Sequence, residues 1–231
     1  MKTLLLCCLL WALLETGTCV SCEVCVGVHK ECTGPVQVCR EQLDSCGIMK
    51  SESVVGEIKS PTFVKACVSS RQCNLAPLYM TFGNGISVST NIACCLGNAC
   101  KKVSIKVPPA NTTLNGQSCP ACYSVFSHHC NEEIIDCTGA QTRCLHVSGT
   151  VKTGQSTIMT TMKGCATESA CTNMQQLKGT FGGFDAELIT AECSPASSHV
   201  ATGLASPYVA PESAGLVLPA LLTVLLVNVL S

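Results

Sequence analysis

Hydrophobic and polar residues alternate in several short stretches of the chain, and glycine-rich segments separate these stretches. Thr62–Val68, Gly85–Ser89 and Cys144–Val147 each place apolar or β-branched residues at about every second position. The segment Gly83-Asn84-Gly85 is typical of a tight turn. Period-two runs joined by such turns predict β-hairpins. Helical periodicity is absent between the two ends of the chain, so the sequence predicts an all-β, loop-rich fold.

A first continuous apolar run, Leu4–Leu14, follows Lys2 and precedes a few small residues. This order is that of a secretory signal peptide, which we place at residues 1–19. A transmembrane helix is the alternative, but eleven apolar residues are fewer than the roughly 20 that span a bilayer. The predicted localisation is therefore extracellular.

A second apolar run, Leu216–Ser231, ends the chain after a small and polar stretch. The run is short for a single membrane span, which needs roughly 20 apolar residues, and no basic residue follows it. Residues 196–231 therefore favour a spacer and the signal for a glycosylphosphatidylinositol (GPI) anchor over a short membrane span. The candidate attachment residues are Ser213 and Ala205.

Cysteine spacing is repeated along the chain. The numbers of residues between successive cysteines are 2, 6, 6, 6, 20, 5, 20, 0 and 4 from Cys22, and 2, 7, 6, 6, 20, 5 and 21 from Cys119. Seven successive gaps agree within one residue, which indicates an internal duplication. We expect a first module at residues 20–102, a linker at 103–116 and a second module at 117–195.

The cysteine count indicates how such modules are stabilised. Small modules with five Phe, three Tyr and one Trp in the whole chain cannot each bury a large apolar core. Secreted domains of this size are usually stapled by disulfides. The chain has 21 cysteines, and signal cleavage after Cys19 or Ser21 leaves an even number, 18. This parity favours structural disulfides over zinc ligation or redox chemistry at the two C-x-x-C pairs. A redox switch at the adjacent pair Cys94-Cys95 remains an alternative that only the bridge pattern of a related family would exclude.

Ten half-cystines, with two residues between the first pair and an adjacent eighth and ninth, resemble the lymphocyte antigen 6/urokinase receptor family. The resemblance implies two tandem three-finger domains, each with hairpins projecting from a disulfide-knotted palm. It further implies nine bridges: Cys22–Cys46, Cys25–Cys32, Cys39–Cys67, Cys73–Cys94 and Cys95–Cys100 in the first module, and Cys119–Cys144, Cys122–Cys130, Cys137–Cys165 and Cys171–Cys193 in the second.

The second module has no counterpart of Cys95 and Cys100, so one closing bridge is missing from it. A ten-cysteine module followed by an eight-cysteine one, with the stretches Ser118–Cys122 and Lys163–Ser169, is similar to the gamma-type inhibitors of secretory phospholipase A2. In a three-finger scaffold, the tips of the second fingers would lie at residues 50–61 and 148–158. Loops on a rigid scaffold are where binding specificity tends to reside.

The remaining motifs exclude several kinds of function. A net charge of −1 without a basic face argues against nucleic-acid binding. No G-x-S-x-G motif, phosphate-binding glycine loop or H-E-x-x-H motif is present, so we assign no catalytic residue, metal or cofactor. His29, His128 and His129 are interpreted as surface residues rather than metal ligands or bases. Asn111 begins the sequon Asn-Thr-Thr and is predicted to be glycosylated, with an unused sequon as the alternative.

Taken together, the sequence predicts a non-enzymatic, GPI-anchored protein on the outer leaflet that binds an extracellular protein ligand, as a receptor does. The alternative is an inhibitor of secretory phospholipase A2. A third hypothesis, modulation of nicotinic acetylcholine receptors, follows from the fold alone.

Overall fold

The computed structural model describes most of the two modules. The expected signal peptide, His29, His128 and the two anchor candidates, Ser213 and Ala205, lie outside the described residues. Within the described part of the chain, no helix has the length and apolar character needed to cross a bilayer. The described residues are 20–28, 31–40, 42–125, 127, 129–153, 156–176, 179–181 and 185–198.

Module one consists of antiparallel strands with short 3-10 turns between them. Its longest strand, β4, lies between β5 and β7, while β1 and β3 form a small separate sheet. Long hairpins form here because apolar and polar residues alternate and glycine closes the turns. The elements are β1 (Ser21–Glu23), β2 (Cys25–Val28), β3 (Val36–Val38), β4 (Ser45–Val55), β5 (Ile58–Val68), η1 (Ser70–Asn74), β6 (Leu78–Phe82), η2 (Gly83–Gly85), β7 (Ile86–Cys95) and η3 (Gly97–Lys102).

Module two repeats the central arrangement, with β10 between β11 and β13. Its first finger is the hairpin of β8 and β9. The elements are β8 (Leu114–Val125), β9 (Glu133–Thr138), β10 (Gln141–Thr153), β11 (Ser156–Thr167), α2 (Glu168–Gln176), β12 (Gly179–Phe181), β13 (Asp185–Pro195) and β14 (Ser197–Ser198). The predicted fold class, a mostly β, disulfide-rich chain with two tandem three-finger domains, is confirmed.

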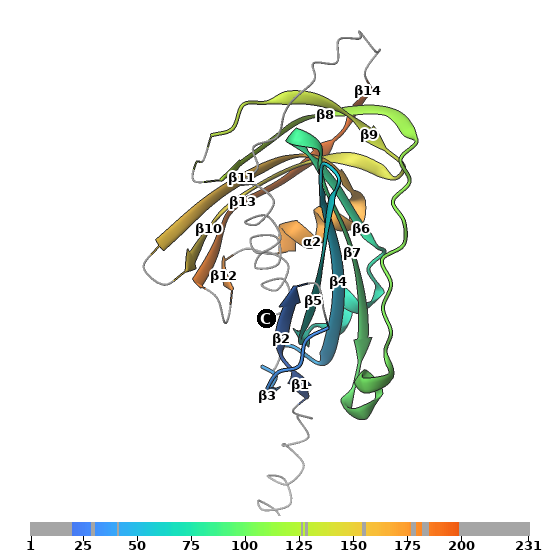
Figure 1. Ribbon diagram of the computed structural model, residues 1–231, viewed down its shortest axis with the longest axis vertical. Coiled ribbons are helices and arrows are strands. Elements are labelled where there is room, and N and C mark those ends of the chain that lie inside the picture. Colours follow the sequence, from blue (N-terminus) through green and yellow to red (C-terminus); the bar gives the residue numbers. More distant parts are fainter. Residues whose placement is uncertain are drawn as a thin grey trace, which may run out of the picture.

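Helix α2 shows that the expectation of no helix in either module was wrong. The helix buries Ala170, Cys171 and Met174, and Thr167 Oγ1 accepts the N–H of Ala170 at its start. It lies in the angle between the two modules, where it contacts β6 as well as β10, β11 and β13 (Figure 1). An isolated helix of nine residues is marginal in water. Packing against these strands therefore stabilises the helix, and the local sequence pattern does not reveal such packing.

The expected linker, residues 103–116, is partly incorporated into the fold. Strand β8 begins at Leu114, before the expected start of module two at Gln117, and β14 adds to β8 beyond the expected end at 195. The remaining linker follows the third finger of module one, as the segment beside β7 in Figure 1 shows. There the amide of Asn91 donates to the carbonyl of Lys106 at 2.8 Å. The segment is therefore bonded to module one rather than hanging free as a spacer.

The two modules join through strand pairing. Strand β6 of module one pairs antiparallel with β11 of module two, with Phe82 opposite Gly164 and Met80 opposite Ala166. This pairing makes one continuous sheet of twelve strands that runs through both modules (Figure 1). Gln141 Nε2 also donates to Thr81 Oγ1 at 2.9 Å across the junction.

A single apolar core spans the same junction. Met80 and Phe82 of module one pack in one cluster with Leu145, Val147 and Met162 of module two, all almost fully buried. Neither module holds this core alone, so the junction supplies burial that each small module lacks. The two bases of the molecule have smaller sulfur-rich cores, one around Cys22, Cys46 and Cys67 and the other around Cys119, Cys137 and Cys165.

We expect Gly164→Val to destabilise the whole molecule. A Cβ at Gly164 would lie 1.9 Å from the carbonyl oxygen of Thr81, so a side chain there forces β6 and β11 apart. Overpacking of this kind costs about 1–3 kcal/mol or more. The measurement is the urea unfolding midpoint of the disulfide-intact protein. The matched control is Gly56→Asn, at a turn with φ +59° and open space around its Cβ, where asparagine is tolerated. Equal losses in both variants would contradict a special role for the junction.

Candidate functional site

Nine disulfides hold the two palms, the bases from which the hairpins project. The pairs coincide with those that the family resemblance implies. Two groups, Cys22/Cys39/Cys67 and Cys119/Cys137/Cys165, bring three sulfur atoms within 4.8 Å of one another. Every one of these sulfurs is part of a disulfide and is therefore not available as a thiolate ligand. The bridges are Cys22–Cys46, Cys25–Cys32, Cys39–Cys67, Cys73–Cys94, Cys95–Cys100, Cys119–Cys144, Cys122–Cys130, Cys137–Cys165 and Cys171–Cys193.

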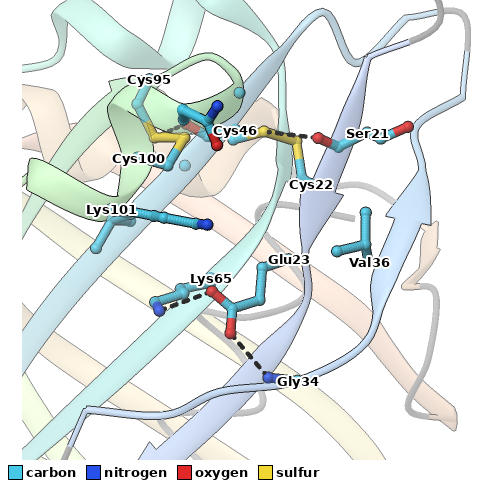
Figure 2. A pocket seen from close by; sticks show the side chains of 14 residues that line it. Ser21, Cys22, Glu23, Gly34, Val36, Cys46, Lys65, Cys95, Cys100 and Lys101 are labelled. Atoms are coloured by element: carbon cyan, nitrogen blue, oxygen red, sulfur yellow. Dashed lines mark hydrogen bonds and ion pairs between the residues drawn. A yellow bond between two sulfur atoms is a disulfide. The ribbon is translucent and has the colours of Figure 1, made fainter.

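The palm of module one contains an open cavity of about 460 Å³, which we call the palm groove. Figure 2 shows it between β1, β3, the start of β4 and the loop of η3. The Cys22–Cys46 and Cys95–Cys100 bridges and the buried side chain of Ile48 line it. Val36, which is 69% exposed, stands on its outer wall. The groove therefore has an apolar lining built on covalent cross-links.

Charged residues line the other side of the palm groove. One carboxylate oxygen of Glu23 lies 2.8 Å from Lys65 Nζ, and the other accepts the N–H of Gly34 at 3.0 Å. The hydrogen bond from Lys65, followed by that from Gly34, lowers the pKa of Glu23 below the ordinary glutamate value. Lys101 extends its amino group towards the groove (Figure 2) and has no ion pair or hydrogen bond with the described residues. The groove thus presents one ion pair and a further lysine, Lys101, whose charge also lowers the pKa of Glu23 without forming an ion pair.

Module two has a cavity of about 340 Å³ at the same place in its own palm, the second groove. The strand registers establish the equivalence: Ile48 stands opposite Lys65 in module one, as His146 stands opposite Lys163 in module two. The chemistry differs, because Lys163 pairs with Glu132, and His146 Nδ1 lies 3.6 Å from a carboxylate oxygen of Glu192. A histidine–glutamate contact therefore occupies the wall that is apolar in module one, while the Lys163–Glu132 ion pair corresponds to Lys65–Glu23.

The other predicted sites are scattered. Asn111 is exposed, as a glycosylated residue must be, and its side-chain oxygen accepts the N–H of Thr113 at 2.9 Å. His129 is also exposed. The expected tip at residues 50–61 is the β4–β5 hairpin, where Ile58 is largely exposed. The second tip, 148–158, is the β10–β11 hairpin, which includes residues outside the described part.

Sequence reasoning missed the palm grooves. One signal could have revealed them: Lys65 and Lys163 each stand two residues before an equivalent cysteine, Cys67 and Cys165. Aligning the two repeats shows this, but the glutamate partners come from different positions, Glu23 and Glu132. The glutamate that pairs with each lysine is therefore not apparent from an alignment of the two repeats.

Comparisons with known proteins agree with this architecture. The family model described as "Phospholipase A2 inhibitor" matches residues 20–102, and the model described as "u-PAR/Ly-6 domain" matches residues 115–201. A gamma-type phospholipase A2 inhibitor of Gloydius brevicaudus siniticus is 32% identical over 201 residues, which cover 86% of this chain and all of the relative. The chain belongs to the phospholipase A2 inhibitor group of the u-PAR/Ly-6 family.

Other members of this family give the same result. The phospholipase A2 inhibitor NAI of Notechis ater is 34% identical over 74% of this chain and 86% of its own length. The 25 kDa phospholipase A2 inhibitor chain of Naja kaouthia is 28% identical over 77% of this chain and 95% of its own. The crystal structure of mouse TEX101 is matched over 78% of this chain and 99% of that one, at 16% identity and a TM-score of 0.33, a likeness too weak to bear on function. The relatives are named as inhibitors rather than as enzymes, and the resemblance to this family is confirmed.

The ion pair in the palm groove should stabilise this family member only above acidic pH. The depressed pKa of Glu23 means that its contribution is present above the ordinary glutamate pKa of about 4.3 and is lost as pH falls through the lower, folded-state value. We expect Glu23→Gln to lower the free energy of unfolding by about 1 kcal/mol at pH 7. At a pH well below the folded-state pKa, the two proteins should be nearly equal.

Urea unfolding of the disulfide-intact proteins at pH 7 and at pH 2 tests this expectation. The control is Glu52→Gln, which removes a more exposed ion pair to Lys59, 3.7 Å long, and should cost less than about 0.5 kcal/mol at either pH. A stability difference for Glu23→Gln that stays constant between the two pH values would contradict the assignment.

Proposed function

We propose that this protein is a non-enzymatic inhibitor that binds a secretory phospholipase A2. The observation that carries the proposal is similarity to gamma-type inhibitors along both modules, up to the whole length of one relative. The shared feature is more than the fold, because the match includes the model specific to phospholipase A2 inhibitors over module one. This similarity favours the inhibitor hypothesis over the receptor-like function that the sequence pattern alone predicts.

The geometry suits binding to a protein. Disulfides at both palms, the β6–β11 pairing and the common core hold the described part of the two modules as one body. A rigid surface loses little conformational entropy when it binds, which improves affinity for a given contact area. Apolar side chains such as Val36, Val38 and Leu96 are exposed on module one, where they are available for contact.

Inhibition of phospholipase A2 is the direct test. The mature protein, purified from expressing cells, should inhibit group I or group II secretory phospholipase A2 at micromolar concentration or below, with a one-site binding curve in calorimetry. A water-soluble monomeric substrate should be used as well as mixed micelles, so that coating of the lipid by the protein is not mistaken for inhibition. The reduced and alkylated protein is the control and should be inactive. If the protein neither inhibits nor binds an enzyme of either group, the proposed function is refuted.

We further propose that the mature protein is extracellular and held on the outer leaflet by a GPI anchor, with Ser213 or Ala205 as the attachment residue. The support is the order of small residues and the short apolar terminus in the sequence. Such a tether is compatible with inhibition, because secretory phospholipases act at membrane surfaces. The inhibitor would then be concentrated where its partner works.

Phosphatidylinositol-specific phospholipase C tests the anchor. Treatment of expressing cells should release the protein into the medium, as detected by flow cytometry and blotting, because the enzyme cleaves the lipid from the glycan. A known GPI-anchored protein on the same cells is the positive control, and a single-pass protein is the negative one. Retention of this protein while the positive control is released would exclude the anchor.

A further inference from the structure

We propose that the palm groove of module one is the surface that docks the partner. It would receive an apolar side chain of the partner, with a partner carboxylate beside it against Lys101. This inference rests on the proposed function, since the partner is taken to be a secretory phospholipase A2. The palm groove lies apart from the finger tips, where the sequence alone predicts that binding specificity resides.

The apolar part of the surface extends beyond the cavity itself. Val36 and Val38 project from the same face of β3, because side chains two apart in a strand point the same way. They are 69% and 67% exposed. Leu96, also largely exposed, stands between two residues that line the groove, Cys95 and Gly97. Covering these side chains would stabilise a complex, at about 25 cal/mol for each Å² of apolar area removed from water.

The charge around the groove selects the partner. Glu23 is neutralised by Lys65, whereas Lys101 and the exposed Lys102 have no ion pair with the described residues. Both lysines lie on η3, the loop that the Cys95–Cys100 bridge closes over the groove. The rim is therefore net positive beside an apolar floor. A partner segment with an apolar side chain next to a carboxylate is complementary to it.

The second groove shows why the docking site lies in module one. Its equivalents of Ile48 and Ala93 are His146 and Glu192, which face each other across β10 and β13. An apolar side chain placed there would have to displace or desolvate charged groups, which is costly. Up to Ser198, where the described part of module two ends, no counterpart of η3 follows β13, and the cysteines that close η3 have no equivalents in the sequence. The duplicated scaffold thus has one groove with an apolar wall and one in which a histidine and a glutamate occupy that wall.

The duplication also supplies matched variants for a test. Val36 and Ile134 each stand three residues before an equivalent cysteine, Cys39 and Cys137, and both are more than 60% exposed. Val36→Asp puts a charge on the wall of the palm groove, and Ile134→Asp puts the same charge on module two. Because both side chains are exposed, neither substitution should disturb folding, which equal urea midpoints would show.

The experiment measures binding of the mature protein and its variants to an immobilised secretory phospholipase A2. We expect Val36→Asp and Lys101→Glu each to weaken binding by about tenfold or more, while Ile134→Asp changes it by less than about twofold. Lys101→Arg should keep the affinity, because it keeps the charge. Binding of the wild-type protein should weaken with rising salt, and that dependence should be smaller for Lys101→Glu.

The other outcomes of this binding experiment contradict either the docking site or the proposed function. Wild-type affinity in Val36→Asp or Lys101→Glu, or equal losses in Val36→Asp and Ile134→Asp, overturns the docking site while leaving the inhibitor function in place. If the wild-type protein does not bind the phospholipase, the proposed function and this inference fall together. Vesicles of phosphatidylcholine with phosphatidylserine serve as a second probe. If Val36→Asp loses binding to the vesicles and not to the enzyme, the groove contacts lipid and the proposal is overturned.

Discussion

Each module is small and poor in aromatic residues, so a core of its own would be small, and the rest of the structure follows from this shortage. Disulfides close each palm, where each bridge contributes about 2–4 kcal/mol by restricting the unfolded chain. The sheet then continues from β6 into β11, so that side chains of both modules share one core. Two domains that look independent in sequence have become one folded body. Gly164 permits it, because only a residue without Cβ lets the two backbones approach so closely.

Sharing a core has a consequence for where the protein can bind. The strands and helix at the junction are buried against each other, and so the faces that meet there are not free for a partner. The β4–β5 finger tip and the palm groove of module one remain exposed. In the palms, the disulfides fix the backbone so firmly that side chains can change without changing the fold. The apolar wall of the groove in module one and the histidine–glutamate wall of the second groove are two outcomes of that freedom on one scaffold.

Much of the fold could be predicted because it is written in local patterns. The hairpins around Gly56 and Gly83-Asn84-Gly85 follow from alternation and from turns that need positive φ, which Gly56 and Asn84 adopt. Helix α2 could not be predicted in this way, since burial of Ala170 and Met174 against other elements stabilises it. The palm groove was missed for a similar reason: Glu23 and Lys65 lie 42 residues apart and meet only when β1 lies beside β5.

The sequence by itself determined that the chain is a duplication of a disulfide-stapled β module, because cysteine spacing and side-chain alternation are local properties that need no partner to be recognised. It also indicated the family, since the cysteine order is conspicuous even where other residues have diverged. Only the tertiary structure decided that the modules share one sheet and one core, because edge strands carry no local mark of the strand they will pair with. It also brought Ile48 and Ala93 together at one palm and His146 and Glu192 together at the other, because strand pairing sets which residues far apart in the sequence face each other.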